Sequence, residues 1–171
     1  VETIGCFYNN LGNSYLDVGE IETAQSKLAR AVIINPSLSE GHSNLGNVYL
    51  RQERVEEAIE QYLTALDILG DDAKTRANLG NAYSFAGDYA TSITHYKKAI
   101  KLDRDNILAY KGLATAYTQS GDFAKAIFQL KTAINKEASD GELYRQLGDV
   151  YMKMDSIEDA IVQYQRALWV E

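Results

Sequence analysis

Residues 44–49 read Asn-Leu-Gly-Asn-Val-Tyr, and closely related stretches recur along the chain at a constant spacing. A Leu-Gly pair stands at residues 11–12, 45–46, 79–80 and 147–148, and a tyrosine follows each glycine three residues later. The gap in this series falls at Ala114, which is flanked by Leu113 and Tyr117 in the same way. The chain of 171 residues therefore contains five copies of a unit of 34 residues.

Other columns of the unit predict two helices in each copy. In the first copy, apolar residues between Ile21 and Val32 recur at the spacing of one helix face. A turn with glycine at positions 19, 87 and 121 precedes this helix in three copies, and Asp88 and Asp122 are placed to cap the helix that follows. A glycine inside a helix costs up to about 1 kcal/mol relative to alanine, so the Leu-Gly column predicts a close approach of a neighbouring helix.

This register of Leu-Gly, tyrosine, Gly-Asp turn and two alanines resembles the tetratricopeptide repeat over essentially the whole chain. The resemblance implies an all-α fold, a right-handed α-solenoid of five tandem helix-turn-helix units, whose first helices form a concave groove that binds proteins or peptides. The expected repeats are 5–38, 39–72, 73–106, 107–140 and 141–171, in a single array over 1–171. Because the last copy stops three residues short, we expect a piece of a longer protein.

The first helix of each copy is predicted to offer one face to a ligand. In copy one the packed face holds Tyr8, Leu11, Gly12 and Tyr15, and the opposite, exposed face holds Cys6, Asn9, Asn10, Asn13 and Asp17. Asparagine recurs on the exposed face in two columns, formed by Asn10, Asn44 and Asn78 and by Asn13, Asn47 and Asn81. Carboxamides offer both donors and acceptors, which suits them to bind a peptide backbone. The alternative is that these asparagines are ordinary surface residues or bond to the neighbouring helix.

The leading hypothesis is an interaction scaffold that holds an extended polypeptide through the asparagine columns, with selectivity from Arg51, Lys74 and Phe85. Phe85 is expected to face the groove, with packing against the next helix as the alternative. The columns are similar to those of the tetratricopeptide arrays in O-linked N-acetylglucosamine transferase and spindle-orientation adaptors. A clamp for a terminal carboxylate is disfavoured, because the cations that it requires at Asn9 and Asn78 are absent.

Two other functions stay open. The segment could be the substrate-recruiting arm of a larger enzyme, such as a glycosyltransferase, whose catalytic domain lies outside it. It could also be a self-assembling structural array. Leu168 and Trp169 form a predicted exposed apolar patch on the last helix, and end-to-end self-association through this patch is a further prediction.

Composition and motifs exclude several classes of function. The formal charge is −7, whereas the five exposed columns carry five bases and four acids, so the acidity belongs to the outer face and nucleic-acid binding is not expected. No apolar run approaches the roughly 20 residues of a membrane span. His42, His95 and the lone Cys6 lack the spacing of metal ligands or a nucleophile, and no phosphate loop or catalytic pair is present. We expect no cofactor, no catalysis within the segment and a cytoplasmic location.

The aromatic residues are assigned mainly to the core. All 12 tyrosines fall in columns that the register places on packed faces, so none is expected to bind a ligand.

Overall fold

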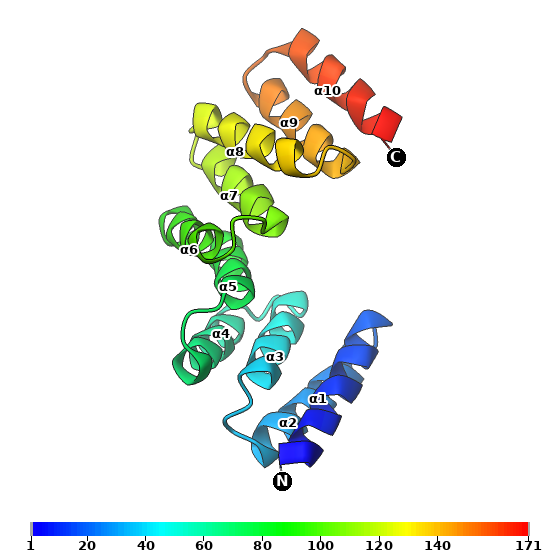
Figure 1. The fold of residues 1–171 in the computed structure, drawn as a ribbon, viewed down its shortest axis with the longest axis vertical. Coiled ribbons are helices and arrows are strands. Elements are labelled where there is room, and N and C mark those ends of the chain that lie inside the picture. The colour runs from blue at the N-terminus through cyan, green and yellow to red at the C-terminus, as the bar shows by residue number, and fades with distance from the viewer. Residues whose placement is uncertain (1, 171) are drawn as a thin grey trace. The chain divides into compact units, whose positions relative to one another are not determined.

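The computed structural model describes residues 2–170, and every regular element in this range is an α-helix (Figure 1). The helices are α1 (Glu2–Asp17), α2 (Ile21–Ile34), α3 (Ser39–Arg51), α4 (Val55–Leu69), α5 (Ala73–Phe85), α6 (Tyr89–Leu102), α7 (Ile107–Gln119), α8 (Phe123–Lys136), α9 (Gly141–Lys153) and α10 (Ile157–Val170). The all-α fold class predicted from the periodicity is confirmed.

The chain divides between Gly87 and Asp88 into two compact units. In the first unit α1 pairs with α2, α3 pairs with α4, and α5 packs on α4. Helix α3 also contacts both α1 and α5, so the first helices of three successive repeats are neighbours. In the second unit α6 packs on α7, α7 pairs with α8, and α9 pairs with α10.

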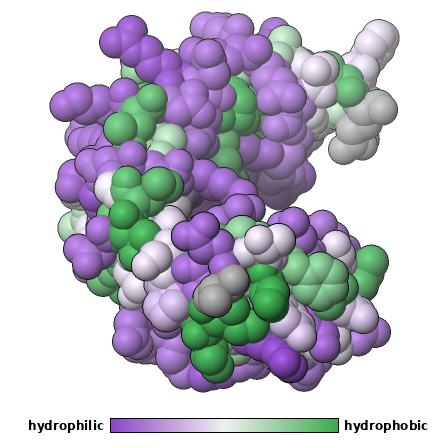
Figure 2. Space-filling model, turned by 60° about the horizontal axis from the view of Figure 1, so that its bottom comes forward, coloured by the Kyte–Doolittle hydropathy of each residue, from purple (hydrophilic) through white to green (hydrophobic). Residues whose placement is uncertain are grey.

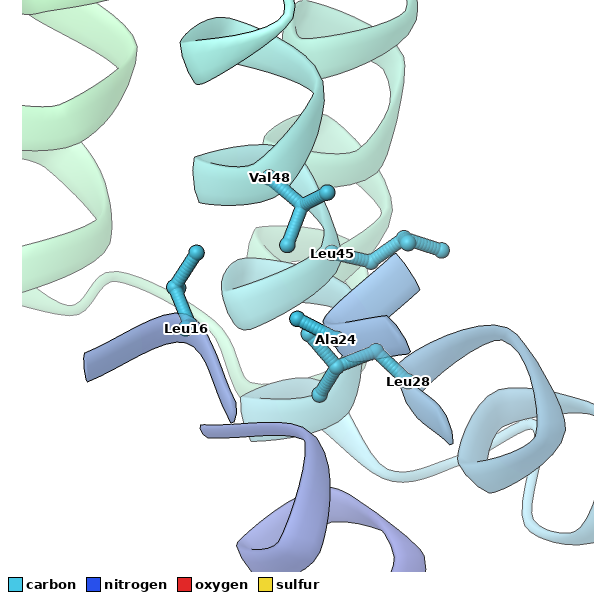
Figure 3. Close-up of a cluster of buried hydrophobic side chains, with 5 residues drawn as sticks. All are labelled: Leu16, Ala24, Leu28, Leu45 and Val48. Atoms are coloured by element: carbon cyan, nitrogen blue, oxygen red, sulfur yellow. The ribbon is translucent and has the colours of Figure 1, made fainter. Parts of the chain in front are cut away.

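One part of the core of the first unit lies where α1, α2 and α3 meet, and another lies between α4 and α5. Leu16, Ala24, Leu28, Leu45 and Val48 form one cluster of buried side chains (Figure 3). The alanine leaves room for the larger side chains of the neighbouring helices, and each buried Leu or Val contributes about 1.5–3 kcal/mol relative to an exposed one. The helix pairs are therefore held both within a repeat and between repeats.

The turns have the conformation that the sequence predicts. Gly19, Gly87 and Gly121 have φ angles of +83°, +79° and +82°. The side chain of Asp88 accepts a hydrogen bond from the Thr91 backbone N–H at 3.0 Å, and Asp122 accepts one from Lys125 at 3.2 Å. Both predicted helix caps are confirmed.

The Leu-Gly column marks the predicted close approach between the helices of one pair. A Cβ atom at Gly46 would lie 2.7 Å from Cε1 of Tyr62, and one at Gly148 would lie 2.6 Å from Cε1 of Tyr164. In the first pair, Gly12 meets Leu28 in the same way at 2.6 Å. The glycines therefore admit a large side chain from the second helix.

Candidate functional site

A groove with a volume of about 390 Å³ crosses α1, α3 and α5 in the first unit. Its lining residues are Asn13, Leu16, Asp17, Asn47, Leu50, Arg51, Tyr62, Asn78, Asn81 and Phe85. All but Tyr62 lie on the first helix of a repeat. Six of the nine predicted site residues are therefore gathered in one place: Asn13, Asn47, Arg51, Asn78, Asn81 and Phe85.

The other three predicted residues lie elsewhere on the first unit. Asn44 and Lys74 line a separate hollow of about 230 Å³, together with Glu40 and Asp72. Asn10 is exposed and lines neither the groove nor this hollow. The two asparagine columns thus differ in what they line, because only the column of Asn13, Asn47 and Asn81 lies wholly in the groove.

The prediction that the whole asparagine face is exposed is wrong for Asn44 and Asn9. Asn44 is only 3% exposed and Asn9 only 2%. The Asn44 Nδ2 atom donates a hydrogen bond to Asn9 Oδ1 at 3.0 Å, which links α3 to α1. A helical projection shows which side of its own helix a residue occupies, but here α1 and α3 cover that side of each other around Asn9 and Asn44.

Asn47 and Asn78 form a second link between repeats while still lining the groove. Asn47 Oδ1 accepts hydrogen bonds from Asn78 Nδ2 at 3.0 Å and from the Tyr62 hydroxyl at 2.7 Å. One alternative for these asparagines is that they bond to the neighbouring helix. This holds for one polar atom of each carboxamide, Oδ1 of Asn47 and Nδ2 of Asn78. Both residues are half-buried, and Asn47 Nδ2 and Asn78 Oδ1 make no hydrogen bond within residues 2–170.

Sequence reasoning missed Tyr62 as a groove residue. Its ring is fully buried, as its packing column predicts, but its hydroxyl donates a hydrogen bond to the groove residue Asn47. Burial raises the pKa of Tyr62 far above its usual range, so the hydroxyl stays protonated. The sequence does contain a signal for Tyr62. A tyrosine on the second helix stands opposite the glycine of the Leu-Gly pair, and this glycine leaves room for the ring between the two helices.

Arg51 and Phe85 add a charged and an apolar side chain to the groove. Arg51 Nη1 donates a hydrogen bond to the Leu16 carbonyl oxygen at 3.0 Å, which places the guanidinium beside the last turn of α1. Asp17 also lines the groove, so the groove carries one negative and one positive side chain. Phe85 is 66% exposed, so it is not a core residue.

The second unit carries the same plan with different chemistry. A hollow of about 150 Å³ is lined by Thr115, Gln146, Asp149 and Lys153, which occupy the columns of the groove residues. The Tyr164 hydroxyl donates to Asp149 Oδ1 at 2.8 Å, and Arg145 Nη1 donates to Asp149 Oδ2 at 2.9 Å. This carboxylate accepts only, whereas Asn47 also offers an N–H.

Three further predictions concern metal ligands, membrane spans and the end of α10. Within residues 2–170, no cluster of three or more histidine, cysteine or acidic side chains is placed to hold a metal ion. No helix of the same range is both long and apolar enough to cross a membrane.

At the end of α10, Leu168 is 74% exposed and Trp169 is 89% exposed, so both have the predicted exposure. The face shown in Figure 2 is mostly hydrophilic, with groups of hydrophobic residues.

Solved structures share this fold at low sequence identity. MamA is 21% identical with a TM-score of 0.78, and the match covers 93% of this chain and 93% of that one. TTC0263, a thermophilic TPR protein of Thermus thermophilus, is 22% identical with a TM-score of 0.84 over 96% and 90% of the two chains. YrrB, described as a TPR protein with an unusual peptide-binding site, is 19% identical with a TM-score of 0.72 over 96% and 84%.

These likenesses show the fold, an α-solenoid of tandem helix pairs. No curated protein matches the sequence. Two profiles of the tetratricopeptide repeat match residues 37–105 and 86–147, and together they span most of the chain. The chain belongs to the tetratricopeptide repeat family.

Proposed function

We propose that this protein is an interaction scaffold that holds an extended polypeptide in the groove across α1, α3 and α5. The observation that carries the proposal is the gathering of Asn13, Asn47, Asn78 and Asn81 from three successive first helices in one groove of about 390 Å³. A groove lined by carboxamides can pair with the N–H and C=O groups of a peptide backbone whatever its side chains are.

The remaining groove residues supply selectivity. Arg51 uses one donor on the Leu16 carbonyl, and its other donors can bind a carbonyl or carboxylate of the ligand. Phe85 offers an exposed aromatic ring on the groove wall, the kind of side chain that often dominates the energy of an interface. YrrB, a TPR protein of similar fold with an unusual peptide-binding site, favours the same type of ligand.

The three predicted residues outside the groove have different places in this proposal. Asn44 is buried and bonded to Asn9, so its role is to join α1 to α3 and not to contact the ligand. Asn10 and Lys74 are exposed, and we assign them to flanking contacts with a longer polypeptide.

Asn13 and Asn81 give the sharpest test, because neither side chain makes a hydrogen bond within residues 2–170 and their loss should spare the fold. The probe is the strongest binder selected from a library of capped random decapeptides, and its affinity is measured by calorimetry. If each asparagine contributes about 1 kcal/mol, the double variant Asn13→Ala/Asn81→Ala should bind about 30-fold more weakly.

The matched control is Thr115→Ala, which truncates the same column in the second unit and should leave the affinity unchanged. Equal binding by the double variant and the wild type, or a library that yields no binder, would contradict the proposal. Far-ultraviolet circular dichroism confirms that each variant keeps its helices.

Self-association is a second candidate, favoured by the exposure of Leu168 and Trp169 on α10. Two large apolar side chains that are more than 70% exposed on one helix end offer a surface to another copy of the chain. This candidate is compatible with peptide binding, because α10 and the groove belong to different units.

A further inference from the structure

Tyr62 lies on α4, the second helix of its pair, yet it is among the residues that line a groove formed by first helices, and its hydroxyl contacts Asn47. The ring passes beside Gly46 on α3, where a Cβ atom would lie only 2.7 Å from Cε1 and 3.0 Å from Cζ. Glycine at this position therefore leaves room for a second-helix side chain to bring its hydroxyl to Asn47, which lines the groove.

The distances around Asn47 show how its carboxamide is oriented. The contact between the Tyr62 hydroxyl and Asn47 is 2.7 Å, which is typical of an O–H···O hydrogen bond and short for one that involves an amide nitrogen. The side-chain oxygen of Asn47 therefore faces Tyr62. The same oxygen accepts a second hydrogen bond from Asn78 Nδ2 at 3.0 Å.

This arrangement leaves one polar atom of each asparagine for the groove. Asn47 Nδ2 and Asn78 Oδ1 have no hydrogen-bond partner within residues 2–170, although both residues line the groove. One is a donor and the other an acceptor, and they belong to neighbouring repeats. A secondary amide, with its C=O and N–H groups, has the matching chemistry.

We propose that Tyr62 is a positioning residue that fixes the orientation of the Asn47 and Asn78 carboxamides, so that the groove presents a donor on α3 and an acceptor on α5. The two ends of a carboxamide have nearly the same shape, so packing alone does not hold one orientation. A buried phenol that donates to the oxygen removes this freedom. The orientation is a property of the free protein, whereas its use in binding rests on the proposed function.

The second unit offers a matched comparison. Tyr164 has the same place in its helix pair and donates to Asp149 at 2.8 Å, but a carboxylate has no donor to orient. The variants Tyr62→Phe and Tyr164→Phe each remove one hydroxyl and one hydrogen bond. Only the first should alter the asparagine pair.

The first experiment records the side-chain amide signals of the whole chain by ¹⁵N-edited NMR. In Tyr62→Phe we expect the Asn47 and Asn78 signals to shift and to broaden by exchange between two orientations, with backbone signals otherwise retained. Tyr164→Phe should leave both asparagine signals in place. Unchanged Asn47 and Asn78 signals in Tyr62→Phe would overturn the positioning role, whatever the outcome of any binding experiment.

The second experiment uses the decapeptide selected on the wild type. Loss of one oriented contact should weaken its binding to Tyr62→Phe by about three- to tenfold and leave Tyr164→Phe unaffected. The wild type should also discriminate against N-methylated versions of the peptide more strongly than Tyr62→Phe does. Shifted amide signals with unchanged affinity would overturn the role of this orientation in recognition.

A second variant guards against a loss of stability in Tyr62→Phe. Asn47→Asp keeps an oxygen for Tyr62 and Asn78 but replaces the groove-facing NH₂ group by oxygen, and it should weaken peptide binding as well. Binding equal to that of the wild type would count against the donor on α3. If the wild type captures no peptide at all, the proposed function fails, and the NMR comparison still decides whether Tyr62 positions the asparagines.

Discussion

Gly46 shows how much one missing methyl group determines in this protein. The absent Cβ lets the Tyr62 ring lie against α3, and the ring in turn brings its hydroxyl to Asn47. Packing and groove chemistry therefore depend on the same glycine. Gly148 and Tyr164 repeat the arrangement with Asp149 in place of asparagine. The packing of a tyrosine ring against a glycine therefore does not require an asparagine as the hydroxyl's partner.

Gly46→Ala should destabilise the first unit, although alanine is the better helix former. The added methyl would lie 2.7 to 3.0 Å from three atoms of the fully buried Tyr62 ring, which would have to shift. Overpacking of this kind costs about 1–3 kcal/mol, against a gain in helix propensity of up to about 1 kcal/mol.

Urea unfolding followed by circular dichroism measures the difference. Gly19→Ala is an instructive comparison, because no atom lies near its missing Cβ and its cost comes from the left-handed turn alone. Stability equal to or above that of the wild type in Gly46→Ala would show that the Tyr62 ring can move aside.

We expect the free energy of unfolding to fall at alkaline pH because of Tyr62 and Tyr96. Burial raises the pKa of both phenols above the usual value of about 10, so their contribution to stability is complete below that pH and is lost as the pH rises above it. Denaturation midpoints in urea should fall above about pH 10, and the double variant Tyr62→Phe/Tyr96→Phe should show a smaller fall. An identical pH profile for the two proteins would refute this assignment.

At the scale of the elements, side-chain caps stabilise the starts of α5, α6, α7, α8 and α9. Asp72, Asp88, Asn106, Asp122 and Asp140 precede helices and accept hydrogen bonds from backbone N–H groups in the first turn. Asp140 does more, because its other oxygen accepts a hydrogen bond from Lys111 Nζ at 3.0 Å, so the start of α9 is tied to α7. This cap therefore joins two repeats as well as starting a helix.

Asp140→Ala should be the most costly of these cap substitutions. It removes a helix cap and leaves the partly buried Lys111 without its partner, for a combined loss of about 1–3 kcal/mol. Asp140→Asn keeps a good capping residue and loses only the ion pair, so its cost should be smaller.

Thermal unfolding of these two variants and of Asp122→Ala provides the measurement. The cap of Asp122 lies in a more exposed place, and its ion pair with Lys125 is local to one helix. We therefore expect Asp122→Ala to cost less than Asp140→Ala. The reverse order would mean that the link between α7 and α9 contributes nothing.

At the scale of the whole molecule, two compact units repeat one plan with different surface chemistry. The first unit carries the asparagine groove, and the second places Thr115, Gln146, Asp149 and Lys153 in the corresponding columns. The first would suit an uncharged backbone, whereas the second has Asp149 already engaged by Tyr164 and Arg145. Ligand contacts are therefore proposed for the first unit.

Trp169→Lys tests self-association through α10. If Leu168 and Trp169 join two copies, the mass measured by sedimentation should rise with concentration in the wild type and stay that of a monomer in the variant. Trp169 fluorescence should shift to the blue as the wild type associates. A wild type that is monomeric at every concentration, with Trp169 quenched as if buried, would end this candidate.

The periodicity alone determined the helix pairs, their turns and the packed columns. These features depend on short-range chemistry: the conformation of Gly19, the caps at Asp88 and Asp122, and apolar residues at the spacing of a helix face. The exposure of Trp169 was also predictable from the sequence, since its column is mostly polar in the other copies.

Only the tertiary structure decided what each asparagine does. Asn44 and Asn81 stand on the same predicted face of a first helix, yet Asn44 is covered by α1 and bonded to Asn9, whereas Asn81 is exposed in the groove. Tyr62 could be assigned to packing from its column, but the reach of its hydroxyl to Asn47 depends on how closely α3 and α4 approach. Distances between neighbouring helices determine which polar atoms are left for a ligand, and the residues of one helix do not specify those distances.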